Sequence, residues 1–352
     1  MGRNGEKSLN TAQGRKKANK KAVLALIVCA VLIVGIVLAD LVKSRSEFSD
    51  TTIAMGTVVS IRLFGSDGEE AAAQIENSIN ETEKALLSWR EKNSDVERIN
   101  ASAGEAVSVS TETVEIISKA LDVSRSCEGA FDITVGKLTE LWDFGGEDQR
   151  LPSEDEITEA LGTVGYSSVK ITDTAVLTAD KQKLDLGAIG KGAACDRVRD
   201  YLSSTSTDSA VISVGGSLLL YGGRSFNIGI VNPANDKEAM GTLELSDICV
   251  STSGNYEKFF VEDGKAYHHI LDARTGYPAD SRLSSVTVVC DSGVLSDALS
   301  TACYILGYND SLALLELYDA EAVFIFKDNT VRITDGLEDK FTLTDESFVI
   351  AG

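Results

Sequence analysis

An uncharged run of 18 residues, from Ala22 to Ala39, constrains this chain more than any other feature of its sequence. At about 1.5 Å of rise per residue, a helix of that length nearly spans the hydrocarbon layer of a bilayer. The 21 residues before it carry seven basic side chains and one acidic side chain. The positive-inside rule therefore predicts that residues 1–21 stay in the cytoplasm and that the chain beyond Asp40 lies outside.

A retained transmembrane anchor at 22–42 is the interpretation that we favour, with a cleaved signal peptide as the alternative. The sequence Val37-Leu38-Ala39 is compatible with cleavage, but the run is long for the hydrophobic part of a signal peptide. We expect a basic arm (1–21), the anchor, a polar linker (43–50) and one extracytoplasmic domain (51–352). This organisation is that of a single-pass protein of the cell membrane.

The formal net charge of −21 falls on the part of the chain after the basic arm, because the arm itself is positive. This balance argues against a nucleic-acid binder, which needs clustered Lys and Arg side chains to contact phosphates. Five of the six cysteines follow the apolar run, at positions 127, 195, 249, 290 and 303. Their odd number, irregular spacing and lack of a CxxC pair favour buried free thiols over disulfides or a zinc site.

Strand and helix patterns are interspersed after residue 50 without a regular rhythm or repeat. A β-branched stretch predicts a strand at 53–64, and helical spacing predicts helices at 69–87 and 111–126. Ser153 with Glu156 three residues later forms a capping box, which starts a helix. Further strands are expected at 168–172, 175–178, 210–214, 226–231, 248–251, 256–261, 284–290 and 321–333. These patterns predict an α+β fold with a mainly antiparallel sheet, flanking helices and a helical subdomain near 69–165.

The first candidate site is the glycine-rich segment 184–192. We expect a strand that ends at Leu186, a tight turn, and a helix over 193–202. Free N–H groups at a helix start favour anions, and Lys191 adds a positive charge suited to phosphate. An ordinary β–α turn explains the same spacing, and the segment lacks the Walker pattern GxxxxGK[ST].

The second candidate is a helical pattern over 294–302, in which Asp297 and Thr301 are four residues apart and share a face. A carboxylate and a hydroxyl that point the same way are hard oxygen ligands of the kind that Mg²⁺ takes. The alternative is an ordinary acid in the first turn of a helix, where the helix dipole favours it.

The third candidate contains the only two histidines, His268 and His269, which follow a good hairpin turn at Asp263-Gly264. Successive residues of a strand point to opposite faces of the sheet, so the two rings cannot both reach one site. One of them is therefore a candidate general base, and the other is structural.

Eight short motifs occur in the order found in one enzyme family. They are Met55-Gly56-Thr57, Leu87-Ser88-Trp89-Arg90, the segment 129–136 (GAFDITVG), the segment 185–191, Gly215-Gly216, the segment 251–257, His269-Ile270-Leu271-Asp272 and the segment 297–301. Over roughly residues 50–310 the chain resembles the FAD:protein FMN transferases, also called the ApbE family of flavin transferases. Each motif is weak alone, but their common order is a specific signal. The resemblance implies a T-fold-like α+β domain.

The resemblance also implies a reaction. A Ser or Thr hydroxyl of another protein attacks Mg²⁺-bound FAD at its FMN-side phosphorus, AMP leaves, and FMN stays on the acceptor through a phosphoester bond. The residues implied to contact FAD are Met55, Trp89, Ala130, Phe131, Asp132, Asp185, Lys191 and Leu271. The implied metal ligands are the carbonyl of Ala188 and the side chains of Asp297 and Thr301. The expected acceptor is an FMN-binding subunit of a membrane electron-transport complex.

By the same resemblance, His269 is the candidate base for the acceptor hydroxyl. An unperturbed histidine titrates at about pH 6.5, so we expect a rate that rises through that range. Trp89 and Phe131 are suited to stacking on a planar ring, although both also suit a hydrophobic core. Three positions depart from the family pattern, with Gly190 in place of Ala, Ser217 in place of Asn or Asp, and Ala273 in place of Pro. The last two put a polar contact and the tightness of a turn in doubt.

Two other functions use the same residues. One is a Mg²⁺-dependent FAD pyrophosphatase, in which water replaces the protein hydroxyl. The other is a membrane-anchored FAD-binding protein without catalysis, which has no need of a metal clamp on the diphosphate. The flavin-carrying acceptor itself is disfavoured because no acceptor-like Ser/Thr stretch is found, and a nicotinamide dehydrogenase is disfavoured because no GxGxxG follows the first strand.

Overall fold

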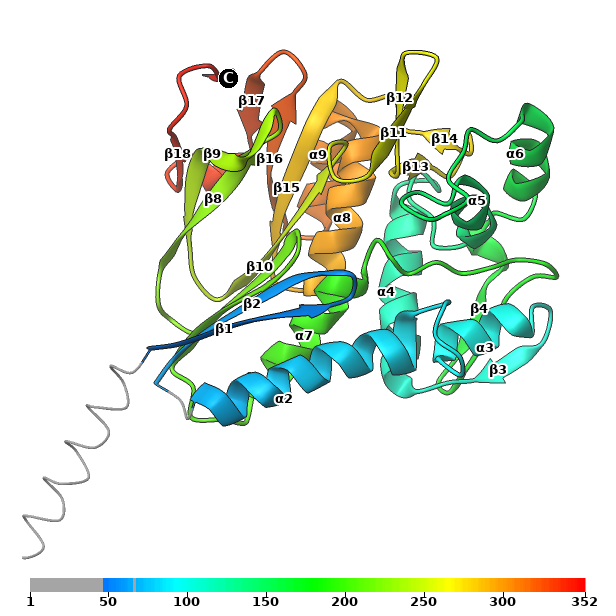
Figure 1. The fold of residues 1–352 in the computed structure, drawn as a ribbon, viewed down its shortest axis with the longest axis horizontal. Helices are drawn as coiled ribbons and strands as arrows, with labels where there is room; N and C mark the ends of the chain where they lie inside the picture. The colour runs from blue at the N-terminus through cyan, green and yellow to red at the C-terminus, as the bar shows by residue number, and fades with distance from the viewer. Residues whose placement is uncertain (1–46, 66–67, 352) are drawn as a thin grey trace, which may run out of the picture.

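A computed structural model describes residues 47–65 and 68–351 (Figure 1). The basic arm and the expected anchor at 22–42 lie outside these residues, so the anchor stays a prediction. Within the described part, every helix is too short or too polar to cross a bilayer.

The largest element is a nine-stranded sheet with the strand order β1-β2-β6-β7-β10-β15-β16-β17-β19. Its strands are β1 (Glu47–Ala54), β2 (Thr57–Phe64), β6 (Ser209–Val214), β7 (Ser217–Tyr221), β10 (Ile248–Gly254), β15 (Leu283–Cys290), β16 (Glu321–Phe326), β17 (Thr330–Ile333) and β19 (Val349–Ile350). All neighbouring pairs run antiparallel except β17 and β19. The predicted mainly antiparallel α+β architecture is therefore confirmed.

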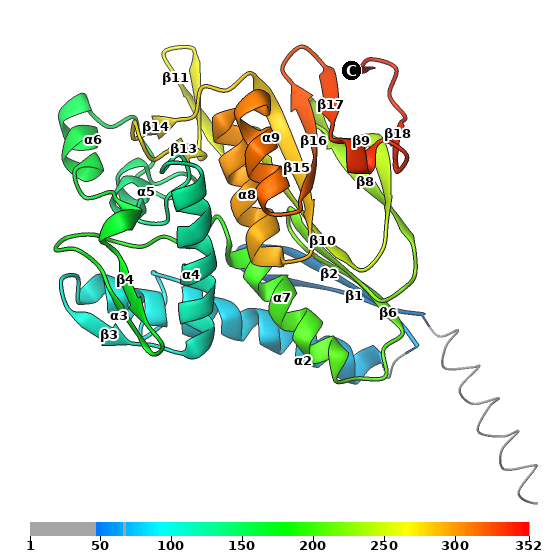
Figure 2. The same cartoon turned by 180° about the vertical axis from the view of Figure 1, so that it is seen from behind.

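Helices cover one face of this sheet, and α4 packs against α8 on their outer side (Figure 2). The described helices are α2 (Gly68–Glu81) with a π-helical turn (Thr82–Leu87), α3 (Asp95–Ala101), α4 (Thr111–Ser126), α5 (Gly136–Trp142), α6 (Glu154–Leu161), α7 (Gly190–Ser203), α8 (Gly293–Leu306) and α9 (Tyr308–Leu317), with 3₁₀ turns at Tyr166–Ser168 and Asp335–Leu337. Apolar side chains of α2 and α7, such as Ile75 and Val198, form one buried cluster with Ile61 and Ile212 of the sheet. Because burial of such residues is the main stabilising term in folding, this layer holds α2 and α7 against the sheet.

Smaller sheets complete the fold. They are β18-β9-β8 (Phe341–Leu343, Asn235–Leu245, Phe226–Asn232), β3-β5-β4 (Ala106–Ser108, Ala175–Leu177, Lys170–Thr172), β11-β12 (Phe259–Glu262, Lys265–His268) and β13-β14 (Leu271–Asp272, Tyr277–Pro278). The first of these shares a buried cluster with the large sheet, in which Leu243 and Phe341 meet Val250 and Val323.

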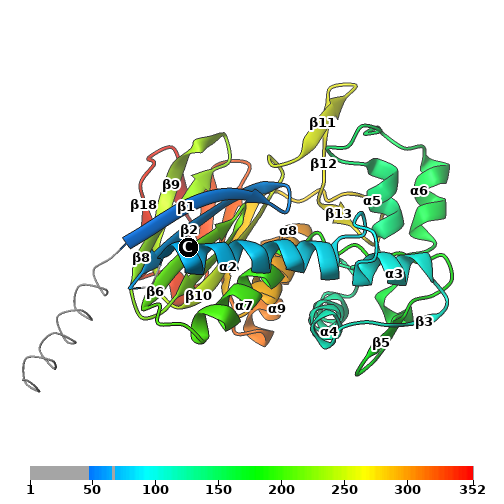
Figure 3. The same ribbon diagram turned by 60° about the horizontal axis from the view of Figure 1, so that its bottom comes forward.

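The hairpin of β11 and β12 projects from the body of the molecule, as Figures 1 and 3 both show. Its turn is Asp263-Gly264, as predicted, and both residues have a positive φ of 50° and 77°. On one face of the hairpin, Phe260 and Tyr267 lie 6.3 and 5.8 Å from the Trp142 ring, measured between ring centroids. The fully buried Trp142 thus ties the hairpin to α5.

Several local expectations are confirmed. The helices expected at 69–87 and 111–126 are present, and the Ser153/Glu156 capping box starts α6. The five described cysteines are free and buried, as the sequence suggested.

The N-terminal boundary was wrong in two respects. The strand expected at 53–64 is instead a hairpin, because Met55 and Gly56 adopt positive φ values of 52° and 66° and reverse the chain. The first strand starts at Glu47, so residues 47–50 do not belong to the polar linker expected at 43–50. An edge strand tolerates such polar residues because one of its faces is exposed to solvent.

Three further strand predictions need correction. The strand expected at 321–333 is a hairpin, in which β16 and β17 pair antiparallel. The segment that ends at Leu186 is not a strand, since only an isolated bridge between Val135 and Lys183 forms there. Asp185 instead donates its N–H to the carbonyl of Ile133 at 2.8 Å, which places the segment against the loop after α4. The strand expected at 256–261 begins only at Phe259.

Candidate functional site

The N-termini of α7 and α8 meet backbone to backbone. A Cβ atom placed on Gly192 would lie 1.9 Å from the carbonyl oxygen of Gly293, so only glycine allows this approach. Asp196 of α7 reinforces the contact by accepting hydrogen bonds from the N–H groups of Gly293 and Val294 at 2.6 and 3.1 Å. The start of α7, which carries Lys191, is thereby fixed beside the first turns of α8.

Asp297 lies at the centre of this junction and is only 4% exposed. Its Oδ2 accepts the N–H of Gly192 at 2.6 Å, and its Oδ1 accepts the Ser217 hydroxyl at 2.5 Å. Ser217 is the residue whose polar contact was in doubt, and the structure gives it one. Across the described residues, no Lys, Arg or His nitrogen lies within 4.0 Å of this carboxylate. A buried carboxylate without a cationic partner is a position where a metal ion is favoured.

The other expected metal ligands supply uncharged oxygens. The Thr301 hydroxyl lies one helical turn from Asp297 and 3.2 Å from the Ser253 hydroxyl, and Ala188 is exposed just before α7. No cluster of three or more His, Cys, Asp or Glu side chains suited to a metal exists in the part of the chain that the structure describes. One carboxylate with hydroxyl and carbonyl oxygens fits Mg²⁺, which keeps few protein ligands beside phosphate oxygens. Each Asp297 oxygen also retains a free lone pair for it.

Lys191 and Glu257 converge on Gly216. A Cβ atom on Gly216 would lie 3.5 Å from Lys191 Nζ and 3.3 Å from Glu257 Oε1, so both charged groups occupy the space that a side chain would fill. Desolvation of the side-chain carboxyl group of Glu257 raises its pKa. The positive charges of Lys191 and Lys258 oppose this rise. Glu257 lies in the 251–257 motif but was not predicted as a site residue, because its closeness to Lys191 depends on tertiary structure.

Met55 reaches the same junction from the turn of the β1–β2 hairpin. Its N–H donates to Glu83 Oε2 at 3.0 Å, which holds the turn against the π-helical segment. Its methyl group would lie 3.3 Å from a Cβ on Gly190. An alanine at Gly190 would therefore require only a small shift of a flexible side-chain end, so this departure from the family pattern is a mild one.

Trp89 is half-buried and packs against the core cluster that also contains Phe131. The guanidinium of Arg90 lies 4.0 Å from the centre of the Trp89 ring, a cation–π distance. A planar ligand that stacks on Trp89 must therefore use the opposite face of the indole or displace Arg90.

The segment 130–132 is almost completely buried. Oδ1 of Asp132 accepts hydrogen bonds from the N–H and hydroxyl of Thr134 at 2.8 and 2.7 Å, and Oδ2 accepts the N–H of Tyr166 at 2.8 Å. These bonds give Asp132 a structural role. Its contact with FAD, and those of Ala130 and Phe131, stay predictions.

Two more residues expected to contact FAD, Leu271 and Asp185, lie near the segment 130–132. Ala273 donates its N–H to the carbonyl of Ala130 at 3.3 Å, which brings the Leu271 loop beside it. A proline at 273 has no N–H and would lack this bond. Leu271 is half-buried, and Asp185 is held by its own turn, in which Oδ1 accepts the N–H of Gly187 at 2.8 Å.

The two histidines face different surroundings, although only His268 lies in β12 and His269 follows it in a bend. His268 is buried, bonds to the carbonyl of Ala279 through Nε2 at 3.0 Å, and packs edge-on against Tyr304. His269 is half-buried, and its Nδ1 lies 3.3 Å from the carbonyl oxygen of Lys258. A carbonyl only accepts hydrogen bonds, so Nδ1 carries the proton and the lone pair of the neutral ring resides on Nε2.

Desolvation and the positive charge of Lys258 lower the pKa of His269 to about 4. The expected rise of the rate near pH 6.5 assumed a ring in water, and the lowered pKa moves the expected rise to lower pH. His269 is neutral at physiological pH, which is the protonation state that a general base requires.

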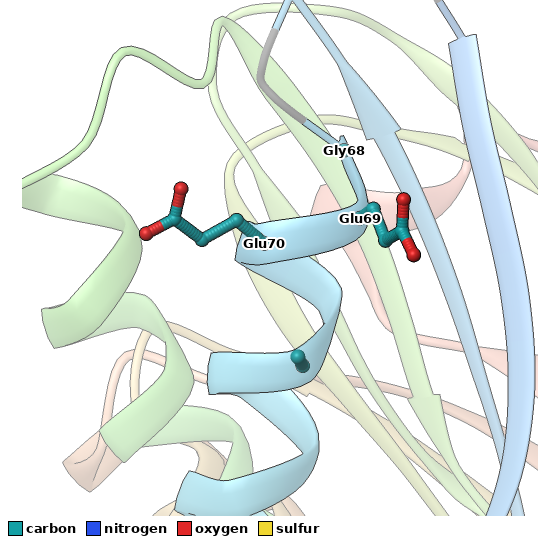
Figure 4. A pocket seen from close by; sticks show the side chains of 4 residues that line it. Gly68, Glu69 and Glu70 are labelled. Atoms are coloured by element: carbon teal, nitrogen blue, oxygen red, sulfur yellow. The ribbon is translucent and has the colours of Figure 1, made fainter.

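Surface depressions elsewhere in the described part do not coincide with these residues. One lies at the start of α2, where Glu69 and Glu70 point in different directions (Figure 4). Another lies between α5 and α6 and is lined by both acidic and basic side chains, including Glu140 and Arg150. Neither contains a residue expected to bind FAD or metal, so the candidate site remains the α7–α8 junction with the segments around it.

Comparison with known proteins shows the family of the chain. The model of the ApbE family matches residues 55–324. The FAD:protein FMN transferase of Treponema pallidum is 31% identical over 86% of this chain and 91% of its own length. The corresponding protein of Klebsiella pneumoniae is 32% identical over 86% of this chain and 96% of its own.

Solved structures give the same result. The ApbE protein of Thermotoga maritima superposes with a TM-score of 0.77 at 32% identity, covering 83% of this chain and 98% of its own. The flavin transferase ApbE of Vibrio cholerae superposes with a TM-score of 0.70 at 26% identity, covering 86% and 98%. With its motifs, its fold and these relatives in agreement, the chain belongs to the ApbE family.

Proposed function

We propose that this protein transfers the FMN part of FAD to a Ser or Thr hydroxyl of an acceptor protein and releases AMP. Its relatives are named for FMN transfer from FAD to protein. The observation that carries the proposal is the buried Asp297 carboxylate, which lacks a cationic partner and lies beside the Lys191 end of α7. This arrangement suits a diphosphate substrate with a divalent cation.

In the proposed reaction, the acceptor oxygen forms a bond to the FMN-side phosphorus of FAD. The bond from that phosphorus to the bridging oxygen breaks, and AMP leaves with the bridging oxygen. The hydroxyl proton goes to Nε2 of His269, whose Nδ1 is held by the Lys258 carbonyl. The products are AMP and a protein that carries FMN through a phosphoester.

Phosphoryl transfer depends mainly on positioning and on neutralising the charge of the phosphoryl oxygens. Lys191 contributes a positive charge, and the N–H groups at the start of α7 contribute partial positive charge. The Lys191 ammonium and the Glu257 carboxylate both lie next to Gly216, where no side chain intervenes. We infer that Glu257 orients Lys191 toward the diphosphate.

Mg²⁺ would be held by the Asp297 carboxylate, the Thr301 hydroxyl and the Ala188 carbonyl. When bound, such an ion neutralises phosphate charge and polarises the phosphorus for attack. Ser217 and the N–H of Gly192 orient the carboxylate through their bonds to its two oxygens. Hydrogen bonds from the N–H groups of Gly293 and Val294 to Asp196 hold the starts of α7 and α8 together.

The experiment that tests the function is an intact-mass measurement. The protein is incubated with FAD, Mg²⁺ and an FMN-binding subunit of a membrane electron-transport complex that carries a Ser or Thr acceptor. A gain of one FMN on that subunit, with AMP in solution, is the expected result. Free FMN and AMP with an unmodified subunit would instead identify a pyrophosphatase, and unchanged FAD would identify a binding protein without catalysis.

We also propose that residues 22–42 hold the chain in the cell membrane with the catalytic domain outside. The support is the uncharged run behind the basic arm. Protease added to intact cells should digest the domain and leave cytoplasmic proteins whole. Digestion that requires cell lysis would contradict this topology.

A further inference from the structure

The outer face of the β11–β12 hairpin is apolar and exposed toward its tip. This exposed part consists of Phe259 and Val261, which are 51% and 61% exposed, and of Ala266, which pairs with Val261 across the hairpin. His268, which pairs with Phe259 on the same face, is buried at the base of the hairpin. Charged side chains near the tip lie on the other face, where Lys265 Nζ is 5.0 Å from the centre of the Tyr267 ring. We call Phe259, Val261 and Ala266 the outer hairpin face.

The fold itself does not require this surface. An isolated two-stranded hairpin is only marginally stable, so this one depends on its inner face. There Phe260 stacks on Tyr267 with ring centroids 5.5 Å apart, and both pack against Trp142. The outer hairpin face is thus presented to solvent by a well-anchored element, and exposed apolar surface of this kind is typical of interaction sites.

The base of the hairpin adjoins the residues proposed for catalysis. The His269 N–H donates to the carbonyl of Lys258 at 3.0 Å, which extends the β11–β12 pairing by one step. The neighbouring Glu257 lies at Gly216, as described above. A partner on the outer hairpin face therefore stands beside His269 and is able to extend a segment over the base of the hairpin toward the imidazole.

A second exposed apolar pair adjoins the same residues from the β1–β2 hairpin. Ile53 and Val58 face each other across the two strands and are 77% and 57% exposed. The Val58 carbonyl accepts the N–H of Gly215 at 3.1 Å, and Gly215 directly precedes Gly216. Gly215-Gly216 therefore connects the pair Ile53/Val58 with Glu257 at the base of the other hairpin.

We propose that the outer hairpin face, together with Ile53 and Val58, is the surface on which the acceptor protein docks. The inference rests on the proposed function, which requires a second protein to bring a hydroxyl to His269. Both apolar surfaces belong to hairpins whose other residues, Met55 and His269, are part of the candidate site. The partner is expected to place apolar side chains beside its Ser or Thr acceptor.

The test compares full-length variants in FMN transfer to the purified FMN-binding subunit. The test variants are Phe259→Ser/Val261→Ser and Ile53→Ser/Val58→Ser. The matched control is Leu317→Ser on α9, because Leu317 is 66% exposed and lies apart from these residues in the fold. We expect KM for the acceptor to rise about tenfold or more in each double variant, as for loss of interface anchors. The kcat value, the affinity for FAD and the control should remain close to wild type.

Unchanged KM in both double variants would overturn the docking surface, and so would an equal rise in Leu317→Ser. A loss of FAD binding in parallel with transfer would also overturn it, because it would show damage to the FAD site. Failure of the wild type to modify any FMN-binding subunit, despite FAD binding, would overturn the proposed function itself.

A second measurement does not depend on loss of function. Val261→Cys and Leu317→Cys are each labelled with a benzophenone maleimide and irradiated with the acceptor. The described native cysteines are buried, which favours labelling of the introduced thiol. Crosslinking from position 261 and not from 317 is expected. Crosslinking of position 261 only to a second copy of this chain would overturn the proposal in favour of self-association.

Discussion

The α7–α8 junction and the β11–β12 hairpin contribute to one site but are built in opposite ways. At the junction, two helix starts touch through Gly192 and Gly293, and Asp297 is buried with both oxygens hydrogen-bonded. The hairpin instead projects from the molecule, is anchored on one face by Trp142 and exposes Phe259 and Val261 on its other face. The junction is suited to holding the diphosphate and the metal rigidly. The hairpin is suited to binding the acceptor protein.

This difference implies a division of labour. Groups that must not move during phosphoryl transfer lie on packed helices, where small displacements are opposed by the whole core. The proposed base lies at the base of the hairpin, next to the surface that a protein acceptor can reach. Changes at the junction should therefore affect metal and FAD chemistry, whereas changes at the hairpin should affect the acceptor step.

The largest effect is expected from Asp297→Ala, which should abolish detectable transfer. This change removes the only buried carboxylate proposed to hold the metal, whereas the proposed ring contacts with FAD at Trp89 and Phe131 are left in place. Transfer is measured by the intact mass of the acceptor, with Asp310→Ala, an exposed acid on α9, as the control. Full transfer by Asp297→Ala, or by wild type in excess chelator, would remove the metal from the mechanism.

His269→Ala should slow transfer by roughly two to four orders of magnitude, the usual scale of general-base catalysis. The affinity for FAD should change little, because the imidazole serves the acceptor step. If His269 only braces the hairpin through its bond to the Lys258 carbonyl, His269→Gln should restore the rate by keeping a donor. A slow His269→Gln with a normal melting temperature supports the base, whereas a wild-type rate in well-folded His269→Ala excludes it.

Ser217→Ala should weaken apparent Mg²⁺ affinity by about 10- to 100-fold, the usual cost of losing a residue that orients a metal ligand. The hydroxyl of Ser217 bonds Oδ1 of Asp297, and the N–H of Gly192 still holds Oδ2. Saturating Mg²⁺ should therefore recover most of kcat. The Mg²⁺ dependence of the transfer rate measures this effect, and an unchanged curve would show that the serine does not support the metal.

The smallest expected effect is that of pH on the transfer rate near neutrality. His269 has a folded pKa of about 4, so the rate should be flat from about pH 5 to 8. Below about pH 4 it should fall about tenfold per unit as the ring takes a proton. The unfolded chain binds this proton at about pH 6.5, so the contribution of His269 to stability falls as pH drops from about 6.5 to 4. A rate that instead doubled through pH 6.5 would indicate a solvated base.

The sequence was most informative where the determinants are local. The Ser153/Glu156 capping box and the Asp263-Gly264 turn each act within a few residues, and both are present as predicted. The order of the nine strands depends on pairings between distant segments, which no local pattern encodes. For the same reason the strand expected up to Leu186 was wrong, since that segment is held by a bond to Ile133 instead.

The same limit applies to the site. Motif order identified Lys191, Asp297 and His269, but not the residues that position them. Ser217 is 80 positions from Asp297, and the closeness of Gly192 to Gly293 arises only when α7 and α8 pack. The low pKa of His269 was also hidden, because it depends on burial and on the Lys258 charge rather than on residue type.

The most direct test of the division between junction and hairpin is the binding of Mn²⁺, a paramagnetic substitute for Mg²⁺, followed by electron paramagnetic resonance. The metal is titrated into FAD-loaded wild type, Asp297→Ala and His269→Ala. We expect one tight site in the wild type, the same site in His269→Ala, and its loss in Asp297→Ala. Retention of the site in Asp297→Ala, or its loss in a well-folded His269→Ala, would contradict the account.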